Sequence, residues 1–224
     1  MDTMSDARCA PPEALATLLR VTDLHLRWGD KAVFTNLNLE IGPGLTAVYG
    51  DESCGKSSLL RLLAGDIAPQ SGAIFLAGVQ AYAVALRQSC YRTDMGSNAH
   101  DTSSARSYWA GLGERYPAWN ASALEALVSG LGLSEHVDKP LYMLSTGSKR
   151  KVWLAAAFSS GARIVLIDTP FAALDRGSVT CVREWLERAA QSTDCACVIA
   201  DYQAPSDLPL RQSLLLHGGA VSAA

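Results

Sequence analysis

A glycine-rich loop between two apolar segments constrains the fold of this chain more than any other feature of its sequence. The run from Gly50 to Ser57, GDESCGKS, fits the pattern G-x-x-x-x-G-K-[ST], in which backbone amides surround nucleotide phosphates. Residues 45–49 before it are typical of a buried strand, and residues 57–64 after it of a helix closed by Gly65. A strand, a glycine loop and a helix in this order predict a site that binds ATP or GTP.

Each residue type in the loop has a chemical role. Gly50 and Gly55 let the backbone turn so that successive N–H groups point at the phosphates, and the following helix presents the positive end of its dipole to them. We expect Lys56 to reach the β and γ phosphates and the Ser57 hydroxyl to bind Mg²⁺. The other loop residues in the predicted contact set are Asp51, Glu52, Ser53, Cys54 and Ser58. We expect Glu52 to face away from the γ-phosphate.

The six cysteines show no paired C-x-x-C spacing, so the sequence predicts neither disulfides nor a zinc site. Cys54 lies in the phosphate loop beside Lys56 and a helix N-terminus, both of which favour the thiolate. Redox control of nucleotide binding is one interpretation of this cysteine. The simpler interpretation, which we prefer, is that the loop tolerates a small side chain at this position.

The overall composition narrows the class of partner. The 224 residues carry a net charge of −3, without the broad basic surface that nucleic acids or anionic lipids require. The first twelve residues lack the pattern of a secretory signal, and no run approaches the roughly 20 apolar residues of a membrane-spanning helix. We therefore expect a cytoplasmic protein with no membrane span of its own and no nucleic-acid partner.

Alternating apolar residues predict antiparallel strands on the N-terminal side of the loop. These strands cover residues 18–28 and 33–41 and are joined at Gly29–Lys31. On the other side of the loop and its helix, a turn at Pro69–Gly72 precedes a strand over residues 73–76. The sequence thus predicts a β-rich layer around the nucleotide loop.

Helices alternate with buried strands in the C-terminal part. Amphipathic spacing predicts a helical insertion within residues 93–139, and a helix over residues 145–159 has Ser145 as its N-cap. A buried strand over residues 163–168 ends in Asp168, whose carboxylate can hold Mg²⁺. The remaining predicted elements are a helix over residues 176–190, a strand over 195–200 and a terminal hairpin over 214–221. This alternation predicts a parallel α/β sheet.

Two further segments resemble, in order, motifs of the ATP-binding cassette (ABC) family, the nucleotide-binding subunits of ABC transporters. Residues 144–151, LSTGSKRK, resemble the family's signature, usually LSGGQ followed by basic residues, and residues 166–175, LIDTPFAALD, resemble its Walker B and D-loop stretch. The resemblance implies a single ABC ATPase domain over residues 13–221, an inserted α-helical subdomain at about 95–147 and a flexible N-terminus over 1–12. The implied fold is an α/β P-loop NTPase of ABC type, with a mixed sheet core and an antiparallel β subdomain.

The resemblance also implies roles for individual residues. Trp28 stands where the family stacks an aromatic ring on adenine, and Asp168 where the Walker B aspartate supports Mg²⁺. Asp175 matches the D-loop aspartate. Ser145 and Gly147 would bind the γ-phosphate held by the opposite subunit, because the family sandwiches two nucleotides between two cassettes arranged head to tail. The implied working unit is a homodimer or heterodimer of cassettes that binds ATP and Mg²⁺.

Three positions depart from the family's pattern. Thr169 follows the Walker B aspartate where the family has a glutamate that activates water, and threonine cannot act as a carboxylate base. Asp201 or Tyr202 stands where a switch histidine is expected, and Tyr202 is the more workable substitute because it can still donate a hydrogen bond. Residues 90–95 lack the Q-loop glutamine, and Asp94 is the candidate to ligate Mg²⁺ instead. We expect slow ATP turnover. The expected catalytic set is Lys56, Asp168, Thr169 and Tyr202.

Two functions from different classes follow. The first is the ATP-binding subunit of a bacterial ABC transporter, peripheral to the inner face of the cell membrane, in which closure of a cassette dimer and slow hydrolysis drive a membrane permease. Residues 109–119 would then face the permease. The second is a regulatory cassette, or the degenerate half of an asymmetric dimer, that clamps ATP without useful hydrolysis; Thr169 and the missing histidine favour it. The signature also resembles that of small bacterial subunits related to haem and cytochrome c maturation exporters, without identifying a substrate or a direction of transport.

Overall fold

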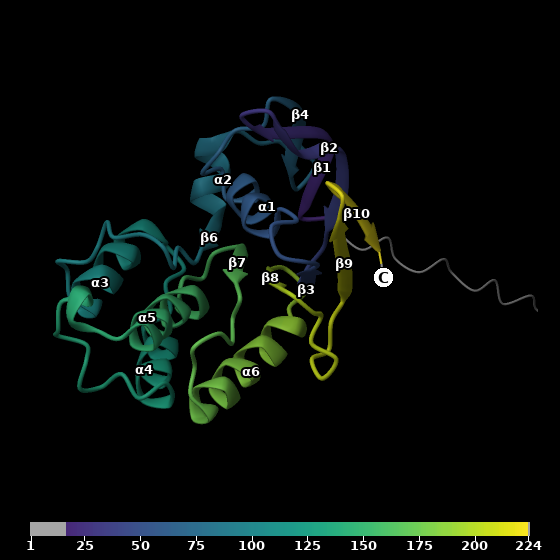
Figure 1. Cartoon of the computed structure of the whole chain (residues 1–224). Helices are drawn as coiled ribbons and strands as arrows, with labels where there is room; N and C mark the ends of the chain where they lie inside the picture. Colours follow the sequence, from purple (N-terminus) through teal and green to yellow (C-terminus); the bar gives the residue numbers. More distant parts are fainter. Residues whose placement is uncertain (1–16, 224) are drawn as a thin grey trace, which may run out of the picture.

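The computed structural model describes residues 17–223, which form two β-sheets with helices between and beside them (Figure 1). The larger sheet has six strands in the order β10-β9-β3-β8-β7-β6. Its strands pair in parallel except for β10, which is antiparallel to β9. The strands are β3 (Gly44–Tyr49), β6 (Cys90–Arg92), β7 (Ile164–Asp168), β8 (Ala196–Asp201), β9 (Gln212–His217) and β10 (Ala220–Ala223).

The smaller sheet is antiparallel throughout, in the order β2-β1-β4-β5. Its strands are β1 (Leu19–Trp28), β2 (Lys31–Ile41), β4 (Ser71–Leu76) and β5 (Val79–Gln80). Helix α1 (Lys56–Leu63) buries Leu59 and Leu62 in one apolar core with Leu24 and Leu37 of this sheet, and the same core includes residues of β7 and β8. Because α1 packs between the two sheets, the position of its first residue is fixed, and the phosphate loop ends at that residue.

Two helices cover the other face of the larger sheet, namely α5 (Thr146–Ser159) and α6 (Arg176–Ala190). Helices α3 (Ala105–Arg115) and α4 (Ala121–Gly130), with the short 3₁₀ turn η1 (Leu141–Met143), lie on one side of α5 and form the helical part at the left of Figure 1. The indole N–H of Trp109 donates a hydrogen bond of 3.1 Å to the carbonyl group of Val152 and so joins α3 to α5. The fold is the predicted α/β P-loop architecture with an antiparallel β layer and a helical insertion.

Several sequence predictions are confirmed at the level of single residues. Helix α6 has its predicted limits, and the Ser145 hydroxyl accepts the N–H group of Ser148 at 3.1 Å, as an N-cap of α5 should. The turn predicted at Pro69–Gly72 is wrong in its second half, because Ser71 and Gly72 already belong to β4. Helix α2 (Ala83–Ser89) and strand β6 are additions to the prediction. The predicted flexible segment 1–12 lies outside the described residues.

The aromatic residues within 109–119 do not form the exposed surface expected for contact with a permease. Trp109 and Tyr116 are each only 4% exposed, and the Tyr116 hydroxyl donates to the Cys90 carbonyl group at 2.8 Å. These rings are buried because they fill the space between the helical subdomain, α5 and β6. Arg115, the basic residue of this segment, lies at the end of α3 and remains exposed.

Gly161 closes the turn between α5 and β7 and brings that turn against the loop before α4. Its φ angle is +60°, a conformation that side-chain-bearing residues adopt at a cost, and a Cβ atom there would lie 2.1 Å from the carbonyl O of Ala118. Gly132, which follows α4, has a similar φ of +65°, but a Cβ atom at this position would meet no other atom within 4 Å. Alanine substitutions at the two glycines therefore separate the free-energy cost of the backbone conformation from the free-energy cost of a steric clash.

We expect Gly161→Ala to lower the free energy of unfolding by about 3 kcal/mol, because backbone strain and a steric clash act together. The control Gly132→Ala should cost about 1 kcal/mol, since only the backbone term applies. Urea unfolding of both variants, followed by circular dichroism, measures the difference. Equal losses of stability would show that the contact with Ala118 has no energetic weight.

Candidate functional site

A cavity of about 1080 Å³ lies at the carboxyl ends of the parallel strands, in front of the first residue of α1. The carboxyl edge of such a sheet is the usual ligand-binding edge in open α/β folds. The cavity is lined by the β1–β2 turn, the phosphate loop, the segment that follows β6, the ends of β7 and β8, Arg150 of α5 and the β9–β10 turn. The lining residues that the sequence predicted are Trp28, Asp51, Glu52, Ser53, Cys54, Gly55, Lys56, Ser57, Ser58, Asp168, Thr169 and Tyr202.

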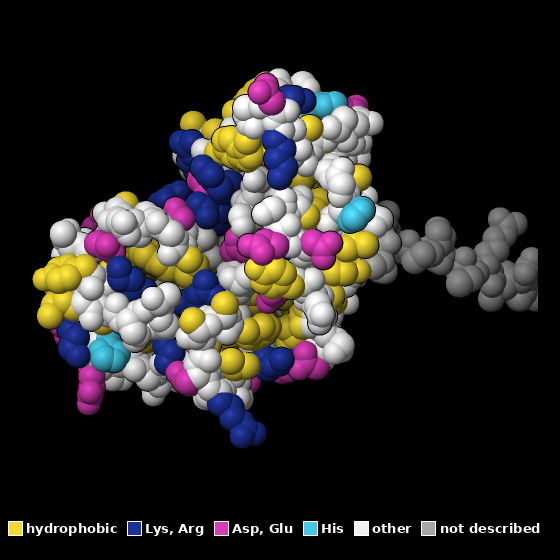
Figure 2. Space-filling model, in the orientation of Figure 1, with side chains coloured by type: hydrophobic (Ala, Val, Ile, Leu, Met, Phe, Trp, Pro, Cys, Tyr) yellow, Lys and Arg dark blue, Asp and Glu magenta, His cyan; other side chains and the backbone are white. Residues whose placement is uncertain are grey.

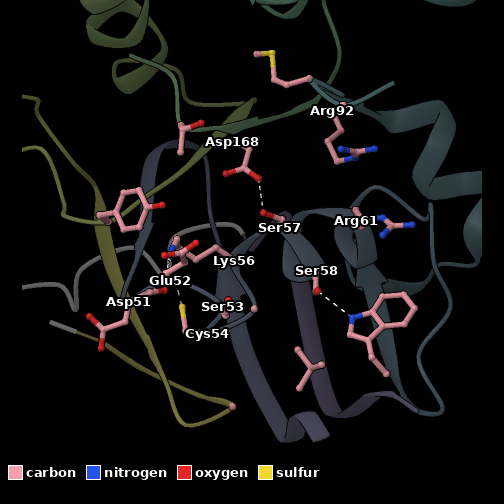
Figure 3. Close-up of a pocket in the computed structure, with 18 of the residues that line it drawn as sticks. Asp51, Glu52, Ser53, Cys54, Lys56, Ser57, Ser58, Arg61, Arg92 and Asp168 are labelled. Carbon is pink, nitrogen blue, oxygen red and sulfur yellow. Dashed lines mark hydrogen bonds between the residues drawn. The ribbon is translucent and has the colours of Figure 1, made fainter. Parts of the chain in front are cut away.

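The phosphate loop wraps around the ammonium group of Lys56. Lys56 Nζ donates hydrogen bonds of 2.7 Å to the carbonyl groups of Gly50 and Asp51, and the residue is only 8% exposed (Figure 3). Gly50 has φ +150°, and a Cβ atom there would lie 2.3 Å from the carbonyl O of Leu216, so only glycine fits. Gly55, at φ +109°, is the N-cap of α1. The loop is thus already bent around Lys56, and a bent glycine loop before a helix N-terminus is the kind of backbone that binds anions.

Ser57 and Asp168 meet although 111 residues separate them in the sequence. The Ser57 hydroxyl donates a hydrogen bond of 2.5 Å to Asp168 Oδ2, which joins the first turn of α1 to the end of β7 (Figure 3). The buried Thr93 hydroxyl accepts the Asp168 N–H at 3.3 Å and so helps to fix the end of that strand. A hydroxyl and a carboxylate are hard oxygen donors, and they fit Mg²⁺ that also binds nucleotide phosphates.

Trp28 forms a wall of the cavity at the end of β1. Its indole N–H donates to the Ser58 hydroxyl at 3.3 Å, and the residue is 48% exposed, so part of the ring remains available (Figure 3). The guanidinium group of Arg61 lies 5.7 Å from the ring centroid. An exposed aromatic ring a short way from a phosphate loop provides a stacking surface for a nucleobase. Sequence reasoning did not find Arg61, which lines the same cavity.

Thr169 adopts a left-handed backbone conformation with φ +45° and is held by an arginine. Arg150 Nη1 donates to the Thr169 carbonyl group at 2.9 Å, to its hydroxyl at 3.2 Å and to the Ala172 carbonyl group at 3.1 Å. Burial lowers the pKa of Arg150, while the nearby carboxylates of Asp168 and Asp201 act in the opposite direction. Arg150 lies within the signature-like segment, yet no sequence pattern indicated this contact.

Of the two candidates for the switch position, Tyr202 is the one that lines the cavity. The Tyr202 residue is 57% exposed, and its ring centroid lies 4.9 Å from Lys56 Nζ. The Asp201 carboxylate accepts the N–H group of Tyr202 at 2.8 Å. This placement favours Tyr202 over Asp201.

The segment that follows β6 lines the cavity with Arg92 and residues 93–96. Arg92 pairs with Asp66 at 2.5 Å and with Asp94 at 3.2 Å. Asp94, the predicted substitute for the Q-loop glutamine, thus lies at the cavity with an arginine partner. Arg92 was missed because the short strand β6, which positions it, has no periodicity to reveal it.

The remaining predicted residues lie outside this cavity. Ser145 is exposed at the start of α5, and Gly147 packs so closely that a Cβ atom there would lie 2.7 Å from the Ala173 carbonyl O. Asp175 is the N-cap of α6 and pairs with Lys151 at 2.5 Å. Within one chain, Ser145 and Gly147 are therefore not brought to the cavity that the phosphate loop lines, whereas Arg150 of the same signature-like segment does line it.

Comparison with known proteins identifies the family. The family model described as ABC transporter matches residues 34–172. The cytochrome c biogenesis ATP-binding export protein CcmA of Cupriavidus pinatubonensis is 31% identical over 231 residues, covering 98% of this chain and 97% of the relative. The CcmA protein of Zymomonas mobilis is 34% identical, covering 75% of this chain and 72% of the relative. The phosphonates import ATP-binding protein PhnC 1 of Ruegeria is 29% identical, covering 81% of this chain and 78% of the relative.

A solved structure described as the ATP-binding subunit of an ABC transporter has the same fold, with a TM-score of 0.80 at 20% identity, and covers 93% of this chain and 90% of its own. The chain belongs to the ABC transporter family and has the features of its ATP-binding subunits. None of the helices between residues 17 and 223 has both the length and the apolar content that a bilayer crossing requires.

We expect Asp175→Asn to reduce stability at neutral pH and to have a smaller effect in acid. The Lys151 ammonium, and next the N–H and hydroxyl groups of Ser178, hold the pKa of Asp175 below its usual range. A lowered pKa stabilises the fold above the unfolded-state value of about 3.9, and that contribution is lost as the pH falls. Asparagine keeps the helix cap but not the charge.

Urea unfolding of the wild type and Asp175→Asn between pH 7 and pH 3 measures this dependence. The stability difference should shrink as the pH falls below about 4. In a Lys151→Met background the difference at pH 7 should be smaller, because the main partner of the carboxylate is gone. A difference that stays constant with pH would contradict the assignment.

Proposed function

We propose that this chain binds Mg·ATP in the cavity and acts as one cassette of an ATP-driven transporter. The observation that carries the proposal is the convergence of Lys56, Ser57 and Asp168 in a cavity that Trp28 also lines. The loop amides and Lys56 would hold the phosphates, Ser57 and Asp168 would hold Mg²⁺, and Trp28 would stack on the base. When bound, Mg²⁺ supplies charge neutralisation on the phosphate oxygens.

The site is proposed to be completed by a second cassette. Ser145 and Gly147 lie outside the cavity, while the cavity itself is open, which supports the family's arrangement in which each nucleotide meets the signature segment of the opposite subunit. Thr146 replaces the first glycine of the usual signature and is expected to weaken that contact. The partner cassette is either an identical chain or a different one.

Hydrolysis in this site is proposed to be slow. Position 169 has a threonine, whose hydroxyl accepts from Arg150 and has no carboxylate to take a proton from water. A positioned general base is worth about 10² to 10⁴ in rate, so its loss leaves binding intact and turnover low. Tyr202 is proposed as the hydrogen-bond donor in place of the switch histidine.

The proposed permease contact is a second cavity, of about 180 Å³, between the helical subdomain and β6. Figure 2 shows Lys and Arg side chains gathered beside this boundary. Among residues 17–223, Arg87 and Arg115 have only carbonyl acceptors, those of Gly65 at 3.0 Å and of Arg87 at 2.8 Å. Two guanidinium groups without a carboxylate favour a permease segment that carries an acidic side chain. Association there would place the chain at the cytoplasmic face of the membrane.

The regulatory alternative keeps the same nucleotide site without useful turnover. Thr169 and Tyr202 both favour it, because each replaces a residue that the family uses in hydrolysis. The rate of Mg·ATP hydrolysis by purified protein is one measurable quantity that separates the two functions.

We expect the wild type to hydrolyse Mg·ATP slowly, Lys56→Ala to abolish that turnover, and Thr169→Glu to raise it by about 10², the lower end of a general-base effect. The lower end applies because Arg150 would pair with the new carboxylate and reduce its basicity. Phosphate release at saturating ATP measures all three proteins. Turnover that appears only in Thr169→Glu would favour the regulatory cassette, and turnover that survives in Lys56→Ala would contradict the assigned site.

We expect Arg115→Gln to reduce association with the permease about tenfold while leaving nucleotide binding unchanged, because the proposed ionic contact with an acidic side chain of the permease is lost. Arg106→Gln is the matched control on the same helix, since Arg106 pairs with Asp138 away from the second cavity. The measurement is co-purification from membranes with the product of a neighbouring gene that encodes about six apolar spans. If Arg115→Gln and Arg106→Gln co-purify with the permease to the same extent, the second cavity is not the docking face.

A further inference from the structure

The contact between Arg150 and Thr169 leaves the threonine hydroxyl in a defined chemical state. Arg150 Nη1 is 3.2 Å from Thr169 Oγ1 and also binds the carbonyl groups of Thr169 and Ala172. A guanidinium group has donors and no acceptor, so the hydroxyl oxygen must accept in this pair. Its own proton is therefore directed to something other than Arg150.

Among the described residues, no acceptor is hydrogen-bonded to that proton, and Thr169 lines the nucleotide cavity next to Asp168. A hydroxyl that accepts a hydrogen bond from a cation is a stronger donor through its own proton. The same polarisation makes the oxygen a poorer base. The residue thus presents a donor to the cavity at the position where a general base would present an acceptor.

The backbone conformation shows that this arrangement is held firmly. Thr169 is β-branched and has φ +45°, a region that such residues rarely adopt without support. Its N–H group donates to the Ala200 carbonyl group at 2.8 Å, while Arg150 binds its carbonyl group and hydroxyl. Contacts on both sides of the residue therefore fix where its hydroxyl lies relative to Ser57 and Asp168.

We propose that Thr169, oriented by Arg150, donates a hydrogen bond to the terminal phosphate of the bound nucleotide. Position 169 then binds the γ-phosphate anion instead of activating water. Thr169 becomes a residue that distinguishes a nucleoside triphosphate from a diphosphate, and Arg150 is the positioning residue that sets the direction of its hydroxyl. This inference rests on the proposed nucleotide site, and it gives the replacement of glutamate by threonine a role in holding the triphosphate state.

The test compares the affinities of AMP-PNP and ADP, each with Mg²⁺, by calorimetry on the full chain. Thr169→Val keeps the shape of the side chain and removes its hydroxyl. It should lower the affinity for AMP-PNP about tenfold or more and leave the affinity for ADP within about twofold of the wild-type value. Thr169→Ser keeps the hydroxyl and should retain the wild-type ratio. Arg150→Met should lower the ratio of AMP-PNP affinity to ADP affinity by several-fold. Thr180→Val, a threonine of α6 far from the cavity lining, is the matched control and should change neither affinity.

Two results overturn the inference. One is an unchanged ratio of AMP-PNP to ADP affinity in Thr169→Val, and the other is an equal loss for both nucleotides, which marks a structural role only. Failure of the underlying site looks different: the wild type would bind neither nucleotide, or Lys56→Ala would bind both as tightly as the wild type. The triphosphate preference and the existence of the site are therefore tested separately.

Discussion

The hydrogen bonds from the Lys56 ammonium group to the carbonyl groups of Gly50 and Asp51 are the interaction on which the site depends. They hold the phosphate loop in a bent shape, so the loop does not lose that conformational freedom when a ligand binds. Burying an ammonium group costs free energy, and the hydrogen bonds that Nζ donates to these carbonyl groups offset that cost. The arrangement requires that β3 and α1 stay fixed, and the apolar core around Leu59 and Leu62 provides this.

The sequence predicted the fold well where a local pattern determines the structure. The Ser145 cap, the limits of α6 and the frame of the phosphate loop all follow from residue types at fixed spacings. Helix α2 and strand β6 were missed, because seven and three residues are too short to show periodicity. The contact of Arg150 with Thr169 was missed for a different reason, since it depends on how α5 packs beside β7, which no local pattern encodes.

The departures from the family's pattern lie near the end of β7, and they affect the same function, the activation of water. Thr169 lacks a carboxylate, and its hydroxyl accepts a hydrogen bond from Arg150. The Tyr202 ring lies beside the Lys56 ammonium group. The residues proposed to bind nucleotide match the family's pattern, while the residues that would activate water are replaced. Under the proposed function, this combination suits long-lived ATP binding, either with slow turnover that drives a permease or beside a more active partner cassette.

The central claim is that the cavity is a Mg·ATP site, and equilibrium binding of ATP to the purified full chain tests it most directly. Calorimetric titration with and without Mg²⁺ should give one site per chain and tighter binding with the metal, because Ser57 and Asp168 are the proposed metal-binding pair. Replacing Asp168 with asparagine should remove most of the metal dependence. No saturable binding of ATP, or binding that is indifferent to Mg²⁺ in the wild type, would contradict the account.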